Sequence, residues 1–468
     1  MGKTSVLEDN KMRSRPMGRL LFGMALPLAL SMLVQALYNI VDSIYVARIS
    51  TEAVTSLSLA FPIQNLQIGF STGIAVGMNS LLSKSLGEGN REKANRAAGN
   101  GIFLMCIAVA LFMTFGIFGS RPFYAMQTDV AAVVDGGSAY TSICCIWTLG
   151  IFVEVMGERL LQASGRTIYT LFTQGTGAIL NILLDPLFIF GFEPLGIAPM
   201  GIAGAAVATV IGQWVAAIMA IIFNLTRNPD VQFGLKYLRP DREIIRLILS
   251  VGIPSVLMMA IGSVMNFSMN QILLGFGALG LVGSAVFGLY FKLQSFVFMP
   301  VFGLNNACIS IVAYNYGARQ PKRITGALKL TLLTALVLML IGMAAFLLIP
   351  ETLMGFFASE NQADAAALVE MGSVALRTIC LSFPMAAVGI ALSASFQALG
   401  VGIYSTISSL CRQLLVLLPA AWLLSLTDQI NNVWLAFPIA EVFSLLVILI
   451  LYRRIYKNKI KPLYEVQQ

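Results

Sequence analysis

The sequence contains no histidine. This absence excludes Ser-His-Asp hydrolases, HExxH zinc enzymes and proteins that hold haem through histidine, because each of these sites needs an imidazole. Charged residues are also scarce, at 11% of the 468 residues, whereas soluble proteins average about 25%. Proton chemistry in this chain must therefore run through carboxyl groups or tyrosine.

The cysteines show no metal-binding or disulfide pattern. Six are present, none in C-x-x-C spacing, and all lie in apolar runs, where a thiol packs as a small apolar side chain. We therefore expect no metal site and no cofactor. The segment Met1–Arg19 is polar and basic, without the short apolar core of a signal peptide, so none is expected.

Long apolar runs dominate what is present. Hydrophobic residues make up 57% of the chain, and the mean hydropathy is +0.82. A helix needs roughly 20 apolar residues to cross a bilayer, and the alternating pattern of membrane strands is absent. The sequence therefore predicts an all-α integral membrane protein with twelve transmembrane helices. We place them at about 18–47, 54–82, 94–119, 136–162, 167–191, 200–225, 244–275, 281–313, 323–349, 366–398, 402–426 and 431–453.

The membrane topology explains the net charge of +8, so a nucleic-acid partner is not needed to account for it. Most of the 30 basic residues lie on alternate connections: the N-terminus, 83–96, 226–246, 319–329 and the C-terminus. Acidic residues dominate the connections between them. By the positive-inside rule, both chain termini are expected in the cytoplasm.

The sequence consists of two similar halves. Gly252-Ile253-Pro254 follows Ala25-Leu26-Pro27 by 227 positions, Gly317 follows Gly87 by 230, and Gly400 follows Gly165 by 235. Two repeats with six spans each share one topology, so we expect two six-helix lobes related by a pseudo-twofold axis along the membrane normal. The predicted parts are an N-terminal segment (1–17), an N-terminal lobe (18–225), a linker (226–243), a C-terminal lobe (244–454) and a tail (455–468).

Two matching prolines lie inside the first helix of each half. Pro27 and Pro254 each remove a backbone hydrogen bond and bend a helix. They either shape the packing or act as hinges during alternating access, and we assign them as hinge residues.

Four acidic residues lie within the predicted spans of the first half: Asp42, Glu154, Glu158 and Asp185. An ionised group near the bilayer centre costs about 2.5–3.5 kcal/mol on insertion scales, so each needs a reason. The alternatives are a protonated structural carboxyl for Asp42 and Asp185, and interfacial solvation at a frayed helix end for Glu154 and Glu158.

A polar stripe surrounds Asp42. Gln35, Tyr38, Asn39 and Asp42 recur at helical spacing on one face of the first span. We assign Gln35, Tyr38, Asn39 and, nearer the cytoplasm, Glu154 to the substrate cavity.

The second half carries fewer intramembrane charges: Lys292, Arg412 and Glu441. Because opposite charges can pair there, we expect a structural ion cluster, with a gating or substrate role as the alternative.

Unpaired carboxyl groups suggest a coupling mechanism. Removal from water favours the neutral form of a carboxyl, and a second carboxylate nearby favours it further. Such a site binds a proton or a cationic ligand, but not both well, and reciprocal linkage then produces antiport.

With these features together, the chain resembles the MATE (multidrug and toxic compound extrusion) exporters over about 450 residues. The resemblance rests on four stretches beyond the two six-helix repeats: Pro27…Gln35…Asp42, Gly87-Glu88-Gly89-Asn90 with Gly317-Ala318-Arg319-Gln320, Arg159 to Gly165, and Asn181 to Pro186. It implies a bacterial DinF-type or MepA-like exporter in the cytoplasmic (inner) membrane, which we expect to be a monomer.

The resemblance also implies roles for residues. Asp42, Asp185, Glu158 and Asn181 would couple cation movement to export of bulky, apolar, often cationic drugs. The NorM-type branch has carboxylates in its C-terminal lobe where this chain has Asn266 and Met269. A proton is therefore the expected coupling ion, with a sodium site in the N-terminal lobe as the alternative.

Three other functions would each need different sequence features. A flippase for lipid-linked substrates would favour a basic cavity, a membrane-embedded enzyme would need a reactive constellation, and a channel would need a filter segment or matched charged rings. The acidic spans favour the exporter.

Overall fold

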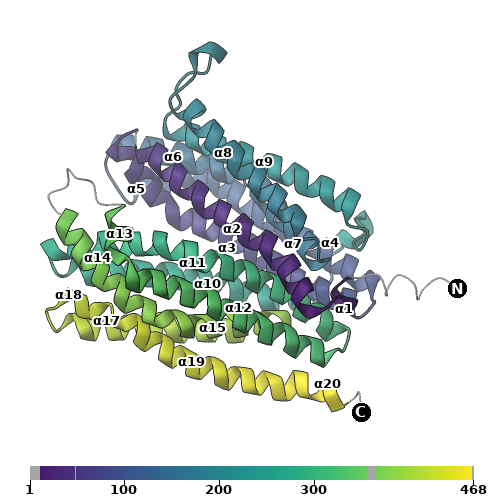
Figure 1. The fold of residues 1–468 in the computed structure, drawn as a ribbon. Coiled ribbons are helices and arrows are strands. Elements are labelled where there is room, and N and C mark those ends of the chain that lie inside the picture. Colours follow the sequence, from purple (N-terminus) through teal and green to yellow (C-terminus); the bar gives the residue numbers. More distant parts are fainter. Residues whose placement is uncertain (1–10, 48, 357–364, 466–468) are drawn as a thin grey trace.

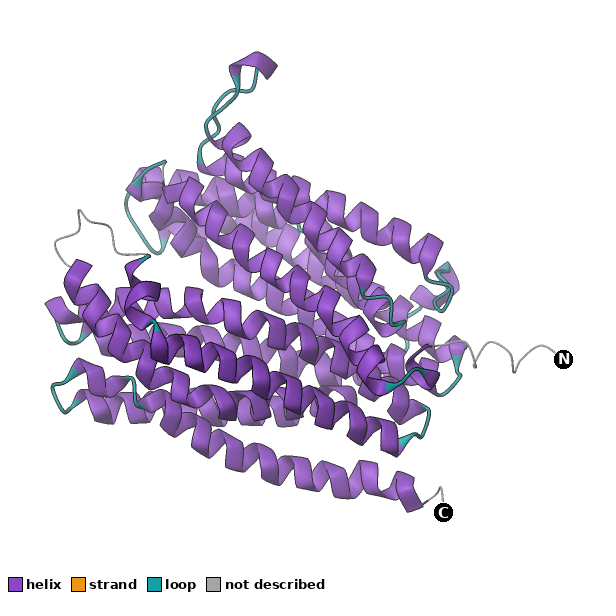
Figure 2. Ribbon diagram, in the orientation of Figure 1, coloured by secondary structure: helices purple, strands orange, loops and turns teal. Residues whose placement is uncertain are grey.

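The computed structural model describes residues 11–47, 49–356 and 365–465. In these ranges the chain is almost entirely helical (Figure 1; Figure 2), apart from short connections and one isolated bridge between Phe192 and Ile197. The predicted terminal segments 1–17 and 455–468 lie partly outside the described residues.

The helices of the first half form one lobe, which is purple to teal in Figure 1. Helix α6 meets α7 at a bend of 45°, so the two form one broken span. The elements are α1 (Lys11–Ser14), α2 (Met17–Ala47), α3 (Thr51–Gly87), α4 (Arg91–Thr114), η1 (Phe115–Gly119), α5 (Ser120–Ala125), α6 (Ala131–Ile146), α7 (Leu149–Ala163), α8 (Ile168–Ile189), η2 (Glu193–Leu195) and α9 (Ile202–Arg227).

The helices of the second half form the other lobe, which is green to yellow in Figure 1. A connection containing η3 (Leu235–Leu238) joins it to the first. Its elements are α10 (Arg242–Leu274), α11 (Ala278–Gly317), α12 (Pro321–Leu348), α13 (Pro350–Gly355), α14 (Ala365–Ile379), η4 (Cys380–Ser382), α15 (Phe383–Ala398), α16 (Gly402–Leu410), η5 (Cys411–Leu417), α17 (Leu418–Ser425), α18 (Ile430–Val433), α19 (Ala436–Ile455), η6 (Tyr456–Ile460) and α20 (Lys461–Glu465).

The predicted twelve-helix, two-lobe fold is confirmed. Among the described residues, ten helices are long and apolar enough to span a bilayer, and the bent α6–α7 pair makes an eleventh. Helix α3 is the twelfth. Its 37 residues are more than a bilayer requires, but polar residues such as Gln64, Asn65 and Gln67 lower its hydropathy. It packs against helices of both lobes, and its Gln67 side chain is only 5% exposed.

The internal repeat is visible in backbone geometry. Gly89 and Arg319, 230 positions apart, both adopt left-handed conformations, with φ of 73° and 54°. The residue after each one donates a 2.9 Å hydrogen bond to the carbonyl five positions earlier. Gly165 and Gly400 repeat this geometry, with φ of 77° and 72°. The sequence similarity between the halves therefore reflects matching helix ends.

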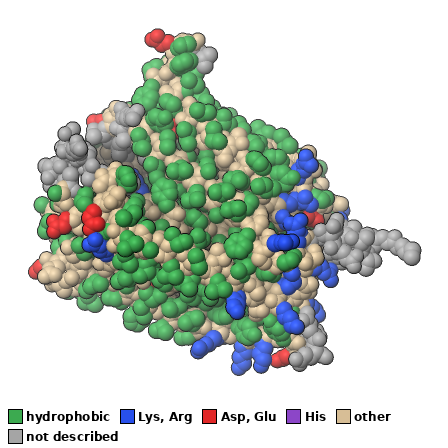
Figure 3. Space-filling view, viewed as in Figure 1, with side chains coloured by type: hydrophobic (Ala, Val, Ile, Leu, Met, Phe, Trp, Pro, Cys, Tyr) green, Lys and Arg blue, Asp and Glu red, His purple; other side chains and the backbone are tan. Residues whose placement is uncertain are grey.

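The surface separates by charge along the bundle. Lys and Arg side chains gather where both chain termini lie, acidic side chains appear at the opposite end, and a broad apolar belt lies between (Figure 3). We call the first the basic end. It contains the α3–α4 turn, the connection between the lobes and the α11–α12 turn.

The lobes are sealed together at the basic end. Helix α3 packs along α10, and α2 along α11. Asn79 and Ser310 hydrogen-bond across the interface at 3.3 Å. A methyl group on Gly87 would overlap the carbonyl of Tyr314, and one on Gly317 would overlap the carbonyl of Lys84. These two contacts are related by the 230-residue repeat, so the seal is symmetric.

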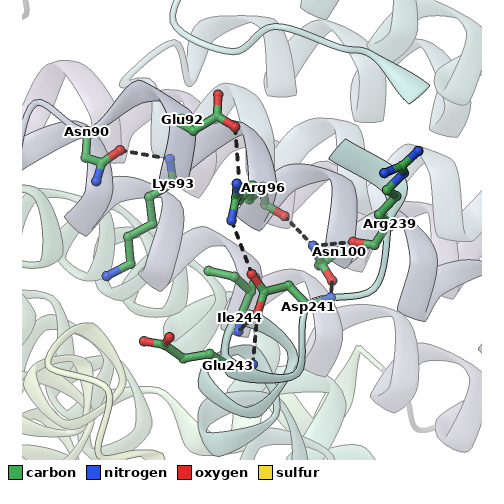
Figure 4. Close-up of polar contacts among 9 residues, drawn as sticks. All are labelled: Asn90, Glu92, Lys93, Arg96, Asn100, Arg239, Asp241, Glu243 and Ile244. Carbon is green, nitrogen blue, oxygen red and sulfur yellow. Dashed lines mark hydrogen bonds and ion pairs between the residues drawn. The ribbon is translucent and has the colours of Figure 1, made fainter. Parts of the chain in front are cut away.

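The connection between the lobes is held against α4 (Figure 4). Arg96 lies between Glu92 (Nε to Oε1, 3.3 Å) and Asp241 (Nη1 to Oδ2, 3.5 Å). The buried Asn100 accepts from the amide of Asp241 at 2.8 Å and donates to the carbonyl of Arg239 at 3.4 Å. Asp241 also caps α10 by accepting from the amides of Glu243 and Ile244. The start of the second lobe is therefore fixed to the first.

Asp230 in this connection predicts a pH-dependent stability. Burial raises the pKa of Asp230, against the opposing effects of Arg166 and Arg91. A carboxyl whose pKa is raised on folding binds its proton more tightly in the folded state, so its ionisation destabilises the fold as pH rises. We expect Asp230→Asn to melt like the wild type near pH 4 and higher than the wild type at pH 8. Thermal unfolding of the purified protein at both pH values tests this, and equal melting at pH 8 would contradict it.

Candidate functional site

Carboxyl groups from three helices gather inside the N-terminal lobe. Helix α2 carries Asp42 and packs against α8, which carries Asp185. The Tyr38 side chain, one turn before Asp42, interacts electrostatically with Asp42, Asp185 and Glu154 of α7. Asp185 also interacts electrostatically with Asp42. The structure thus brings together residues that lie up to 147 positions apart in sequence.

Asp42 is incompletely hydrogen-bonded. Its side chain is half-buried, and its Oδ1 atom is shielded from solvent without a hydrogen-bond partner. A buried acceptor without a donor is costly, and protonation or a bound cation would remove that cost. Among the described residues, neither Asp42 nor Asp185 takes part in an ion pair.

Asp185 is fully buried and is held by an amide. Asn181, one turn earlier on α8, is 3% exposed, and its amide bridges Asp185 to Thr209 of α9. With its nitrogen 3.3 Å from Asp185 Oδ2, its oxygen accepts from the Thr209 hydroxyl at 3.1 Å. Asn181 and Asp185 therefore form one polar unit that faces α9 and α2.

Glu158 and Glu154 form a second pair, one turn apart on α7. Glu158 is 3% exposed and accepts from the Thr173 hydroxyl at 2.7 Å and from the Gln174 amide at 2.8 Å. Glu154 is half-buried and interacts electrostatically with Glu158. The alternative that a frayed helix end solvates both does not fit, because they lie inside a continuous α7.

Several polar neighbours of the site carry no signal in the sequence. The amide of Gln64 on α3 donates to the Tyr140 hydroxyl of α6 at 2.8 Å, and Tyr140 interacts with Asp42. Thr173 and Gln174 lie next to each other on α8, and Thr209 lies on α9, in stretches whose hydroxyl and amide groups are ordinary for a membrane helix. Only the packing of the helices shows that they reach the carboxyl groups.

The remaining cavity and hinge residues lie on the helices that line the lobe interface. Gln35 is half-buried on α2, whereas the side chain of Asn39 lies outside the described residues. Pro27 and Pro254 are buried inside the continuous helices α2 and α10. The Pro254 carbonyl accepts from the Thr406 hydroxyl at 2.9 Å.

In the C-terminal lobe, Arg412 and Glu441 form an ion pair. Arg412 Nη1 lies 3.1 Å from Glu441 Oε1, with side-chain exposures of 29% and 13%. Arg412 lies in the π-helical segment η5 within the eleventh span. The predicted third member, Lys292, is exposed on α11 and joins no ion pair among the described residues. The cluster is therefore a pair.

This pair predicts a coupled stability effect. Removing one partner of a mostly buried pair leaves a charge without compensation, which costs about 3–5 kcal/mol, whereas replacing both can be neutral. We expect Arg412→Met to lower the melting temperature strongly and Arg412→Met with Glu441→Met to restore most of it. Thermal melts of both purified variants decide this, and additive losses would show that the pair contributes nothing as a pair.

No three acidic or cysteine side chains within the described residues are grouped as a metal site would require. Asp42, Asn181 and Asp185 offer carboxylate and amide oxygens, the donor type that hard cations prefer. The carboxyl groups can each hold a proton, and their oxygens could contact a small monovalent cation.

Two proteins of similar sequence are described as an exporter and a transporter. The multidrug export protein MepA of Staphylococcus saprophyticus is 23% identical over 93% of this chain and 94% of that protein. The FAD transporter of Shewanella oneidensis is 24% identical over 92% and 93%.

Solved structures match over nearly the whole length. A crystal structure of MATE in complex with MaL6 has a TM-score of 0.90 at 24% identity, covering 97% of this chain and 99% of that one. An outward-facing multidrug resistance MATE transporter of the MOP superfamily has a TM-score of 0.87 over 99% of both chains. The family model MatE matches residues 27–187 and 254–423, one segment in each lobe. The chain therefore belongs to the MATE family of multi-pass membrane transporters.

Proposed function

We propose that this multidrug efflux transporter exports bulky, apolar, often cationic compounds by antiport with a cation, and that the cation is a proton. The observation that carries the proposal is the group of Asp42, Asp185 and Glu154 around Tyr38, with one unbonded oxygen on Asp42. The MATE family membership and the MepA relatives support the drug-efflux part.

Coupling requires that a proton favours one conformation over the other. With Asp42 and Asp185 ionised, two negative charges repel inside the lobe. When one is protonated, it can donate a hydrogen bond to the other and draw α2 towards α8. The proton shifts the conformation only because it interacts differently with the two conformations of the transporter. Proton uptake then weakens cation binding, and reciprocity requires that substrate binding releases the proton.

The charge asymmetry supports an orientation with the basic end in the cytoplasm of a bacterial inner membrane. In that orientation the symmetric seal at Gly87 and Gly317 closes the cytoplasmic side. The described state is then open to the outside, where substrate leaves and protons enter. We propose further that the transporter works as a monomer in the bilayer, without a cofactor, a nucleic acid or a catalytic step.

Transport in inside-out vesicles tests the coupling ion. Ethidium uptake is followed by fluorescence while pH and sodium gradients are imposed separately. We expect a pH gradient, acid inside the vesicle, to drive uptake at zero sodium, and a sodium gradient at constant pH to drive none. Uptake driven by sodium alone would overturn proton coupling and favour a sodium site made by Asp42, Asn181 and Asp185.

The Shewanella oneidensis relative named FAD transporter supports a second candidate, the export of a flavin nucleotide. Export of a flavin nucleotide, unlike export of a cationic drug, requires a positively charged side chain on the protein that contacts the phosphates of the substrate. The alternative of a lipid-linked substrate would require a positive group as well.

A further inference from the structure

Lys292 is a lysine in the membrane part of α11 that the coupling mechanism does not use. It is exposed, although a charge at this depth is costly unless it faces water, a partner or a cavity. Among the described residues it takes part in no ion pair, and Arg412 already neutralises Glu441, the nearest candidate predicted from the sequence.

The register of α11 shows which way Lys292 faces. Near the basic end, α11 contacts the N-terminal lobe through Gly303, Ser310 and Gly317, which meet Ala29, Asn79 and Lys84. Lys292 precedes Ser310 by 18 residues, which is five full turns of an α-helix. Lys292 therefore lies on the face of α11 that is turned towards the N-terminal lobe.

Burial along α11 agrees with this direction. On the opposite side, Phe287 stacks near Trp434, and Tyr290 and Leu293 are buried in the C-terminal lobe. On the side of Lys292, Leu281 and Phe296 are exposed. The face of α11 that contacts the N-terminal lobe near the basic end is thus exposed further along the helix, where Lys292 lies.

We infer that Lys292 recognises the anionic group of transported substrates, a phosphate or carboxylate attached to an apolar body. The inference rests on the second candidate under the proposed function, export of a flavin nucleotide, and names the side chain that would meet its phosphate. A lysine ammonium acts as a point charge that binds phosphate without fixed geometry, which suits substrates of varied shape.

Riboflavin and flavin mononucleotide test this inference, because they share an isoalloxazine ring and differ by one phosphate. Binding to the purified protein in nanodiscs is followed by flavin fluorescence anisotropy. We expect the wild type to bind flavin mononucleotide about tenfold more tightly than riboflavin. Lys292→Met should abolish the preference and Lys292→Arg should retain it. Lys457→Met, which removes an exposed lysine at the basic end, should leave it unchanged.

A second measurement needs no variant. Acetylation of the wild-type protein, read at Lys292 by mass spectrometry, should be slowed by flavin mononucleotide and not by riboflavin. Equal binding of both flavins, a preference that survives Lys292→Met, or unprotected acetylation would each overturn the inference. Neither assay uses an ion gradient, so the two proposals can fail separately. If protons do not drive ethidium efflux but the protein still prefers the phosphorylated flavin, only the proposed function is defeated.

Discussion

Asp42→Asn and Asp185→Asn should each abolish ethidium efflux while the protein still inserts and folds. Asparagine has nearly the same shape as aspartate, but it can neither lose nor gain the proton on which the proposed switch depends. Asp185→Asn keeps an acceptor for Asn181, and Asp42→Asn removes the negative charge from a carboxyl group whose Oδ1 has no hydrogen-bond partner. We therefore expect melting temperatures at or above that of the wild type, with transport reduced at least about a hundredfold.

The matched control is Asp135→Asn. Asp135 is an exposed aspartate of the same lobe, paired with Arg121 at 3.2 Å, and surface pairs contribute about 0–1 kcal/mol. It should transport like the wild type. Normal efflux by both Asp42→Asn and Asp185→Asn would remove the carboxyl pair from the mechanism. A folded Asp42→Asn protein that still binds ethidium but no longer exports it would assign Asp42 to coupling rather than to substrate binding.

The second large effect concerns the seal at the basic end. Gly87→Ala and Gly317→Ala each place a methyl group on a backbone carbonyl of the other lobe, those of Tyr314 and Lys84. A carbonyl cannot rotate away as a side-chain tip can, so the lobes must separate there. We expect efflux to fall at least about tenfold in either variant, because the closed state is destabilised and alternating access stalls.

Cysteine labelling shows whether the loss has this cause. Ser310→Cys places a thiol at a fully buried position of the interface, and a maleimide should label it faster in the Gly87→Ala and Gly317→Ala backgrounds. Gly326→Ala is the control, since a methyl group on Gly326 of α12 meets nothing within 4 Å. Unchanged efflux and unchanged labelling would show that the two glycines are not a closing contact.

The individual helices could be predicted from sequence because bilayer insertion depends on each segment's own composition. Eleven of the twelve spans stand out by their apolar length, and α3 was found by length despite its polar residues. The repeat between the two halves can also be recognised in the sequence, because turns of the same conformation require similar residues. The pairs Gly89 with Arg319 and Gly165 with Gly400 adopt the same backbone conformations.

The site was predicted only in part. Asp42, Asp185, Glu154 and Tyr38 were found because an acidic or polar residue in a membrane helix is conspicuous, and the structure brings them together. Thr173, Gln174 and Thr209 were missed because hydroxyl and amide groups are common in such helices and carry no cost that marks them. The roles of the carboxyl groups stay predictions until transport is measured.

The sequence by itself determined where the chain crosses the membrane, that it consists of two related halves, and which half holds the unpaired acids. Only the tertiary structure decided which charges meet. Lys292 is expected beside Glu441, yet among the described residues Glu441 pairs with Arg412 and Lys292 joins no ion pair. The register of α11 turns Lys292 towards the other lobe instead. Insertion is a sum over single residues, whereas pairing depends on the rotation and packing of separate helices, which no local pattern encodes.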